Sequence, residues 1–589
     1  MLLLWGVLAG ILLYMEIIYH LGCFGITIGT PVLTIPFILI VSGLIALLIG
    51  SVPKKWKKRC LYLTLVPIFI LFAAQMVYMN IFKQPLLWEA TIQGGQDALT
   101  NYWREALVGV GITSPFLLLQ ALPMIILAVL FRKKVWILPR FGGFEKLMSL
   151  FLALGGILLS IGIILGGKMT SQEYYEEYHE FFDPLTIAED MGVLTLAQRD
   201  TALLIGRTYE NLKEAMTENP GVPPIIAQVE PIHSSVEPES EEPPATDPSA
   251  EPVAQQPDTS PNVLPILFDQ LLELSESDDE TWLANYIRDL RPTNRNEYTG
   301  IFEGYNLIYI TAEGFSPYAV REDLTPTLYR LTHSGFVFPN FYVPLWQTST
   351  SDGEYINCTG LIPDGQFSMR KSGSNDMAYT LPRYFALEGV SSMAYHNNSL
   401  SYYQRNITHN NLGYTFKAAT LGNLNAEEWG QSIFPMEHPK EWPASDLEMM
   451  QGTIPEYMQQ DRFHVYYMTV SGHMNYNFGG NAMSRKNQEA VANLPLSENA
   501  QAYIACHIEL DKALEYLLEQ LELAGKLDNT VICLSADHYP YAITEEQYEE
   551  LAGRDLSENK DFMRNNLILW NAGMEDQTVV VEKVCGSMD

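Results

Sequence analysis

The sequence predicts two parts: an α-helical membrane domain with five spans, then an α/β domain with a mainly parallel, doubly wound sheet. Three observations support this prediction. Five apolar segments in the first 168 residues are long enough to cross a bilayer. From Tyr305 to the end, buried-strand patterns alternate with helical patterns, which is typical of βαβ units. At 589 residues, the chain is also too long for a single core.

The charges around the apolar segments predict their topology. The basic clusters Lys54 to Arg59 and Arg132 to Arg140 follow the second and fourth segments. Basic loops remain in the cytoplasm, so the N-terminus is expected inside the cell and everything after Lys168 outside. A cleaved signal peptide would account for the first segment only. The apolar segments occupy residues 2–19, 26–50, 60–81, 106–131 and 147–167.

Charge is divided unevenly between the two parts. Residues 1–168 carry 13 Lys and Arg against 5 Asp and Glu, whereas the rest of the chain carries 23 against 64. An acidic exported part excludes nucleic acid as a partner, because phosphate backbones need a basic surface. Six cysteines without CxxC spacing provide neither a disulfide framework nor a zinc knuckle.

Composition divides the exported part further. Residues 169–217 read as extracellular juxtamembrane helices, and residues 218–263 as an acidic, Pro-rich disordered linker. Residues 264–589 are expected to form the α/β domain, truncated at its C-terminus. Within this domain, Leu and Ile recur at helical spacing after Glu498, and Gly525 is expected to end that helix.

Four predicted strands end in acidic or imidazole side chains. YNLIYITAEG ends near Glu313, VSSMAYHNN contains His396, VYYMTVSGH ends in His473, and VICLSADH ends in Asp537 and His538. One such residue after an apolar run is usually a turn residue or a cap. Because the carboxyl ends of parallel strands open onto one crevice, four together predict a metal or phosphate site.

A fifth segment, Thr350-Ser351-Asp352-Gly353-Glu354, reads as a helix start. Ser351 and Glu354 have the spacing of a capping box, which is the interpretation favoured by local evidence. A helix N-terminus also presents free N–H groups and a positive dipole to an anion. A hydroxyl at Thr350 is therefore well placed to attack a phosphate.

Together these motifs resemble lipoteichoic acid synthase and its relatives, which are bacterial membrane enzymes with the sulfatase/alkaline-phosphatase fold. The resemblance rests on the order and approximate spacing of the motifs, and it extends over the five spans and DPLTIAEDMGVLT. The motifs are AEGF after the first strand, TSDGEY, the run from His396 to Arg405, SGH at 471–473 and ADHY at 536–539.

The resemblance implies roles for individual residues. Thr350 would be the nucleophile, and Glu313, Asp537 and His538 would bind a divalent metal together with the Thr350 oxygen. This mostly hard ligand set favours Mn²⁺ or Mg²⁺ over a zinc site rich in thiolates. The substrate phosphate and head group would be held by His396, Tyr403, Arg405 and His473.

The implied reaction is metal-dependent transfer of glycerol phosphate from phosphatidylglycerol to an envelope glycolipid or teichoic-type polymer, through a phospho-threonine intermediate. Where relatives continue Asp-His-Tyr with Gly and later Ser, this chain has Pro540 and Ala542, and Tyr403 stands where Trp is usual. The alternatives are phosphoethanolamine transfer, or another phosphotransfer or hydrolysis reaction of the sulfatase superfamily, and non-catalytic binding of envelope polymer. A sulfatase would need C/S-x-P-x-R, but Cys358 is followed by Thr-Gly-Leu.

Overall fold

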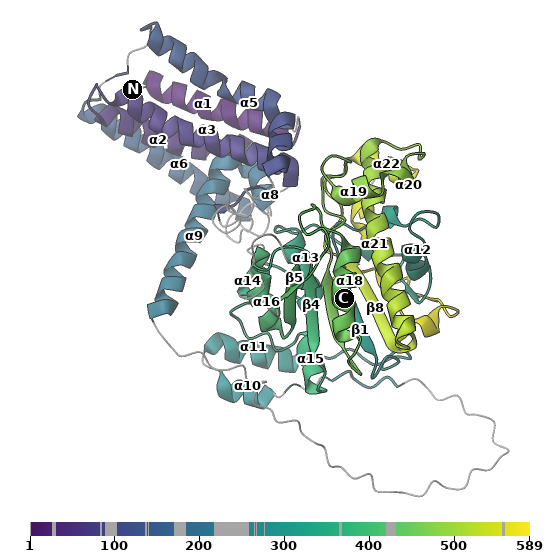
Figure 1. The fold of residues 1–589 in the computed structure, drawn as a ribbon. Helices are drawn as coiled ribbons and strands as arrows, with labels where there is room; N and C mark the ends of the chain where they lie inside the picture. The colour runs from purple at the N-terminus through teal and green to yellow at the C-terminus, as the bar shows by residue number, and fades with distance from the viewer. Residues whose placement is uncertain are drawn as a thin grey trace, which may run out of the picture. The chain divides into compact units, whose positions relative to one another are not determined.

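The computed structural model describes most of the chain (Figure 1). The described residues are 2–25, 31–82, 85–88, 103–135, 138–139, 141–169, 184–216, 258–263, 266, 268–275, 277–364, 368–419, 432–556 and 560–589. Most of the expected linker, residues 218–263, lies outside them. Contacts divide the chain into two compact units, Met1–Gln228 with Asn306–Asp589 and Val229–Tyr305.

Five N-terminal helices are long and apolar enough to cross a membrane, as the sequence predicts. They form a bundle around a shared core of Leu, Ile, Phe and Met side chains. With no water in hydrocarbon, each backbone amide has to be paired within the segment, which is why such runs become helices. The five are α1 (Leu2–Cys23), α2 (Pro31–Ser51), α3 (Lys57–Phe82), α5 (Trp103–Arg132) and α6 (Gly143–Met169).

Hydrogen bonds at the two ends of the bundle agree with five spans, because they join the segments that an odd number of spans places at the same end. At one end, the buried Lys57 ammonium donates to the carbonyls of Ile49 and Pro139, so the two basic loops lie side by side. Toward the other end, the Glu16 carboxylate accepts from the Val193 amide at 2.7 Å. Val193 begins α9 (Val193–Met216), which follows the fifth span and is preceded by α8 (Pro184–Thr186) and η1 (Ile187–Met191).

The described part of the Val229–Tyr305 unit contains two helices, α10 (Phe268–Leu274) and α11 (Asp278–Asp289). The Ser277 hydroxyl accepts from the Glu280 amide at 3.1 Å and so caps α11.

The α/β part is built on a nine-stranded sheet with the order β11-β2-β10-β8-β1-β7-β4-β5-β6. Six neighbouring strands, from β8 to β6, pair in parallel, whereas β10 is antiparallel to both β8 and β2. The mainly parallel sheet confirms the predicted fold class. Its strands are β1 (Asn306–Ala312), β2 (Phe336–Val337), β4 (Ser392–His396), β5 (Thr415–Ala419), β6 (Ile433–Phe434), β7 (His464–Met468), β8 (Thr530–Ala536), β10 (Ile568–Trp570) and β11 (Val579–Val580).

Successive residues of each central strand pack in different hydrophobic cores, since their side chains point to opposite faces of the sheet. In β7, Val465 and Tyr467 join the larger core, and Tyr466 and Met468 join the smaller one. Helices α12 (Pro326–His333), α18 (Asp446–Tyr457) and α21 (Glu498–Leu523) cover the first face. Helices α13 (Thr350–Thr359), α14 (Ser368–Lys371) and α16 (Arg405–Leu412) cover the second (Figure 1).

Shorter elements complete the α/β part. Gly525 follows α21 with a φ of +66°, as expected for the residue that ends this helix. A second sheet orders β12 (Cys585–Gly586), β3 (Phe341–Tyr342) and β9 (Arg564–Asn565). The short helices are η3 (Pro317–Ala319), α15 (Leu381–Leu387), η4 (Tyr402–Gln404), α19 (Ala482–Lys486), α20 (Gln488–Val491), η6 (Leu527–Asn529), α22 (Glu545–Ala552), α23 (Lys560–Met563) and η7 (Ala572–Met574).

Candidate active site

Two adjacent parallel strands bring acidic side chains together. β1 and β8 pair in register up to Ala312 and Ala536, so the residues that follow them, Glu313 and Asp537, leave the sheet at the same edge. Asp537 Oδ1 accepts from the Gly314 amide at 2.9 Å and from the His538 amide at 2.8 Å. These two bonds fix the carboxylate at the carboxyl ends of the strands, the edge where ligands bind in open α/β sheets.

Helix α13 presents Thr350 to the same edge. Gly353 allows the close approach, because a Cβ atom there would lie 1.9 Å from the Asp537 carbonyl oxygen. The Asn357 amide group ties the helix to β1 and β8 by donating to Thr311 Oγ1 and to the Ala536 carbonyl. Thr350 is the first residue of the helix, so its hydroxyl stands beside the free N–H groups of the first turn.

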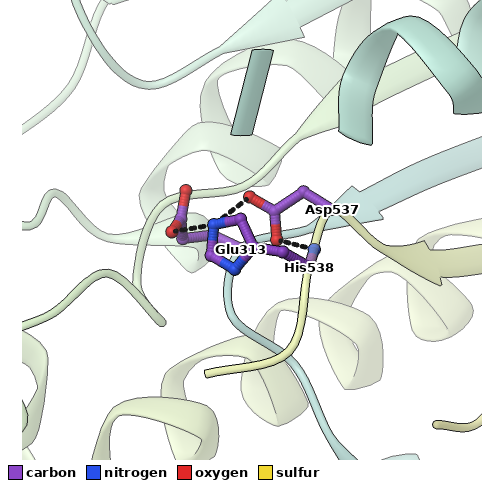
Figure 2. A group of neighbouring side chains, drawn as sticks. All are labelled: Glu313, Asp537 and His538. Carbon is purple, nitrogen blue, oxygen red and sulfur yellow. Dashed lines mark hydrogen bonds and ion pairs between the residues drawn. The ribbon is translucent and has the colours of Figure 1, made fainter. Parts of the chain in front are cut away.

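The four side chains implied as nucleophile and metal ligands converge in one cluster. Thr350 Oγ1 donates to Glu313 Oε2 at 3.1 Å and lies 3.4 Å from His538 Nε2. His538 Nε2 lies 3.2 Å from Asp537 Oδ2 and 3.6 Å from Glu313 Oε1. Figure 2 shows Glu313, Asp537 and His538 turned toward one another. Each offers one ligand atom within 4.8 Å of the others, and all three are buried.

The cluster has the electrostatics of a cation site. Burial, followed by the nearby Asp537 charge, holds the pKa of Glu313 well above its usual range. Asp537 Oδ2 is buried and accepts no hydrogen bond from any residue the structure describes. Two buried carboxylates, one with an oxygen that accepts no hydrogen bond from the described residues, are costly without a cation. The residues present therefore fit a divalent metal ion.

Arg405 and His396 are both buried, whereas an arginine side chain that binds phosphate at the surface would be exposed to solvent. Arg405 is 1% exposed, and its Nε donates to both oxygens of Glu354, at 3.2 and 2.9 Å. Its Nη1 is buried and has no hydrogen-bond partner among the described residues. His396 ends β4, and burial, with the Arg405 charge beside it, lowers its pKa to about 3. The imidazole is therefore neutral near pH 7.

His473 lies in the loop after β7. Asp446 holds this loop, because its carboxylate accepts from the amides of Val470 and Ser471. Gly472 fits between neighbours, since a Cβ atom there would lie 2.1 Å from the Glu313 carbonyl oxygen. Burial lowers the pKa of His473 to about 4. The loop that carries SGH is thus packed directly against the end of β1.

Tyr403 lies in the turn η4, just before Arg405. Both Tyr403 and Gln404 have positive φ, at 54° and 57°. Non-glycine residues rarely adopt this conformation, and where they do it often marks a constrained functional loop. The Arg405 guanidinium lies over the Tyr403 ring, with its Cζ 5.3 Å from the ring centroid.

The expected capping box is wrong. Ser351 lies inside α13, and it is Asp352 Oδ2 that accepts from the Thr348 amide ahead of the helix, at 2.8 Å. Glu354 is fully buried and binds Arg405, His409 and Tyr466. Sequence reasoning missed this network because its members lie 51 to 112 positions from Glu354. One local signal could have indicated this network. Glu354 is a charged residue one turn beyond Thr350, on the side of the short helix that is buried.

Comparison with known proteins agrees with this geometry. The sequence profile of the Sulfatase family matches residues 305–589. Lipoteichoic acid synthase 2 of Bacillus subtilis is 23% identical over 337 residues, 54% of this chain and 48% of that protein. Lipoteichoic acid synthase 1 of the same organism is 26% identical over 300 residues, 48% of this chain and 44% of that protein. The chain spans about half the length of the curated relatives it matches.

Among solved structures, the lipoteichoic acid synthase LtaP of Listeria monocytogenes aligns with a TM-score of 0.41 and 20% identity, over 52% of this chain and 74% of that one. The phosphoglycerol transferase GacH of Streptococcus pyogenes aligns with a TM-score of 0.34 and 14% identity, over 48% and 72%. The match of the Sulfatase family profile to residues 305–589 agrees with the mainly parallel sheet found there.

Proposed function

We propose that this protein is a membrane-anchored transferase that moves glycerol phosphate from phosphatidylglycerol to an envelope glycolipid or teichoic-type polymer. The observation that carries the proposal is the convergence of Thr350, at a helix N-terminus, with Glu313, Asp537 and His538. This arrangement combines a nucleophile, a site for a cation and free N–H groups for a phosphoryl group. The names of the curated relatives support the choice of substrate class.

The chemistry proceeds in two displacements. The Thr350 oxygen forms a bond to phosphorus while the bond from phosphorus to the diacylglycerol oxygen breaks, and the Thr350 proton balances the proton that diacylglycerol gains. A hydroxyl of the acceptor then attacks phosphorus and releases Thr350. Mn²⁺ or Mg²⁺, held by Glu313, Asp537, His538 and the Thr350 oxygen, would supply charge neutralisation and a lower pKa for that hydroxyl.

Four further residues are assigned to the substrate in this proposal. Arg405 presents an unpaired Nη1, which suits the oxygens of a phosphate. His396 and His473 are neutral imidazoles able to hydrogen-bond the phosphate or glycerol without adding positive charge. Tyr403 would form part of the wall that contacts the head group.

The anchor has a proposed topology as well. With the N-terminus in the cytoplasm, five spans carry Thr350 to the outer side of the membrane, where a lipid donor presents its head group. A reporter fused after Lys168 should then be active only if it works outside the cell. A reporter fused at Lys57 should be active only if it works inside.

Alternative functions make different predictions. Phosphoethanolamine transfer uses the same nucleophile and metal chemistry, and differs only in the head group. A sulfatase that converts a cysteine is excluded, because Cys358 is 4% exposed in the smaller core and lacks the required motif. A non-catalytic protein that binds envelope polymer would not consume a lipid donor.

The test uses the full chain in detergent with Mn²⁺ and two separate lipids. Release of diacylglycerol from phosphatidylglycerol, and not from phosphatidylethanolamine, is the result that this proposal predicts. Diacylglycerol from phosphatidylethanolamine alone would favour the alternative head group. No release from either lipid, with Mn²⁺ bound, would favour the polymer-binding function.

A further inference from the structure

A buried charge network extends from the helix that carries Thr350. Glu354 lies one turn beyond Thr350 in α13 and is 0% exposed. Its Oε2 accepts from Arg405 Nε at 2.9 Å. Its Oε1 accepts from His409 Nε2 at 3.1 Å and from the Tyr466 hydroxyl at 3.2 Å. One carboxylate therefore connects α13 to α16 and to β7.

The network contains a buried ion pair, Glu354 with Arg405, and stability alone does not explain it. Burial by itself would raise the pKa of Glu354, but Arg405 and His409 outweigh burial and lower it to about 2. Buried ion pairs of this kind are often no more stabilising than apolar residues of the same volume. What the pair does provide is a guanidinium held by Nε in one orientation, while Nη1 has no hydrogen-bond partner in the part of the chain that the structure describes.

Arg405 acts on the imidazole at the end of β4. Its charge, after the larger effect of burial, helps to lower the pKa of His396. His396 pairs with Met468 of β7, which also pairs with Thr311 of β1, so His396 lies at the edge of the sheet where Glu313 follows β1. An anion bound at Thr350 would meet the same positive charge.

We propose that Glu354 is a positioning residue that fixes Arg405 relative to Thr350, so that Nη1 meets the phosphoryl group attacked by the Thr350 oxygen. Thr350 and Glu354 are four residues apart and lie on the same side of one rigid helical turn. Displacing a group by about 1 Å can cost ~100-fold in rate, so this rigid connection has a kinetic consequence. The inference rests on the proposed function for its substrate, a phosphodiester.

The experiment is a double-mutant cycle on the full chain in detergent, with Mn²⁺ and phosphatidylglycerol. Glu354→Asp withdraws the carboxylate by one methylene and keeps its charge. We expect this change to lower kcat ~10-fold or more in the parent, and by less than about 2-fold when Arg405→Gln is already present. His409→Gln, which loosens Glu354 from its other side, should show the same dependence on Arg405 with a smaller loss.

Glu456→Asp is the matched control. Glu456 also binds one basic side chain and one tyrosine hydroxyl, from Lys417 and Tyr395. Its shortening should leave kcat unchanged, whether or not Arg405 is replaced. Equal losses from Glu354→Asp with and without Arg405 would show a structural role and overturn the inference, and so would an unchanged kcat in Glu354→Asp.

A second readout separates this inference from the proposed donor. If phosphatidylglycerol is not consumed, the same variants are compared for binding of inorganic phosphate to the Mn²⁺-loaded chain. Glu354→Asp should weaken phosphate binding ~10-fold in the parent and leave it unchanged in the Arg405→Gln background. Equal weakening in both backgrounds would overturn the positioning role, while the donor question would be decided by the lipid assay alone.

Discussion

Two buried glutamates near the nucleophile have opposite electrostatics. Glu313 faces Asp537, and burial with that second negative charge holds its pKa well above the usual range. Glu354 faces Arg405 and His409, which overcome the effect of burial and lower its pKa to about 2. Both residues are nearly inaccessible to solvent, at 5% and 0% exposed. Burial alone therefore does not decide the state of a carboxylate here.

The difference shows which cation each site requires. Glu354 receives its positive charge from the chain itself, through hydrogen bonds with defined geometry. Among the described residues, His538 is the one basic side chain within ion-pair distance of the Glu313 and Asp537 carboxylates, and Asp537 Oδ2 accepts no hydrogen bond from them. The Glu313 and Asp537 cluster is short of positive charge and is held in a fixed geometry, so it suits a metal ion. The charge of Glu354 is already neutralised by Arg405, so this pair suits the positioning of the guanidinium.

Thr350→Ala should have the largest effect. Loss of the nucleophile should lower turnover by ~10³-fold or more, because the covalent intermediate can no longer form. Folding should be nearly unchanged, since among the described residues the hydroxyl bonds only within the cluster. The assay is diacylglycerol release at saturating Mn²⁺, with thermal unfolding measured in parallel.

Ser351→Ala is the control for this prediction. Ser351 is the next residue of α13 and is also buried, but its hydroxyl is not part of the cluster. Its turnover should stay within a few-fold of the parent. Retention of more than a few per cent of activity by Thr350→Ala would remove Thr350 from the role of nucleophile.

Glu354→Gln should be the most destabilising of the carboxylate changes. Breaking one side of a buried ion pair leaves an uncompensated charge, here Arg405, at a cost of about 3–5 kcal/mol in the free energy of unfolding. Urea denaturation at pH 7 measures this cost. The double variant Glu354→Gln/Arg405→Gln should recover much of it, and a double variant as unstable as the single one would show that the charge pair is not the cause.

The same ion pair should make the free energy of unfolding depend on pH under acidic conditions. The pKa of folded Glu354 is about 2 and its ordinary value is 4.5, so its stabilising contribution is complete above pH 4.5 and is lost as the pH falls toward 2. The loss amounts to about 3 kcal/mol over this window. Between pH 5 and pH 2, the stability of the parent should therefore fall more than that of Glu354→Gln/Arg405→Gln, and parallel curves would contradict the assigned shift.

Asp537→Asn should give the smallest change in stability, with the opposite sign. Without metal, removing one of two repelling carboxylates should raise the free energy of unfolding by about 1 kcal/mol. The amide oxygen can still accept from Gly314 and His538. Thermal unfolding in a chelator measures the effect, and a large destabilisation there would mean that Asp537 is a structural residue instead.

Sequence predicted those parts of the molecule that depend on local periodicity. Five apolar runs gave five helices, and the strand patterns ending at Glu313 and Asp537 gave β1 and β8. Because neighbouring parallel strands end at one edge, the convergence of these residues also followed from pattern.

Sequence could not predict the partners of charged side chains within the core. Glu354 looked like a capping residue because Ser351 stands three positions before it, and Arg405 looked like an open phosphate fork. Their pairing depends on how α13 and α16 pack on one face of the sheet. The antiparallel strand β10 and the small sheet around β3 were also missed, because two or three residues carry too little periodicity to indicate pairing.

The most direct test of the metal site is the affinity of the full chain for Mn²⁺, measured by titration calorimetry after removal of metal. We expect roughly one tightly bound ion per chain in the parent and in Glu354→Gln/Arg405→Gln, and an affinity lower by ~100-fold or more in Asp537→Asn. Equal affinity in the parent and Asp537→Asn would show that the ion binds elsewhere, and would contradict the assignment of Glu313, Asp537 and His538 as a metal site.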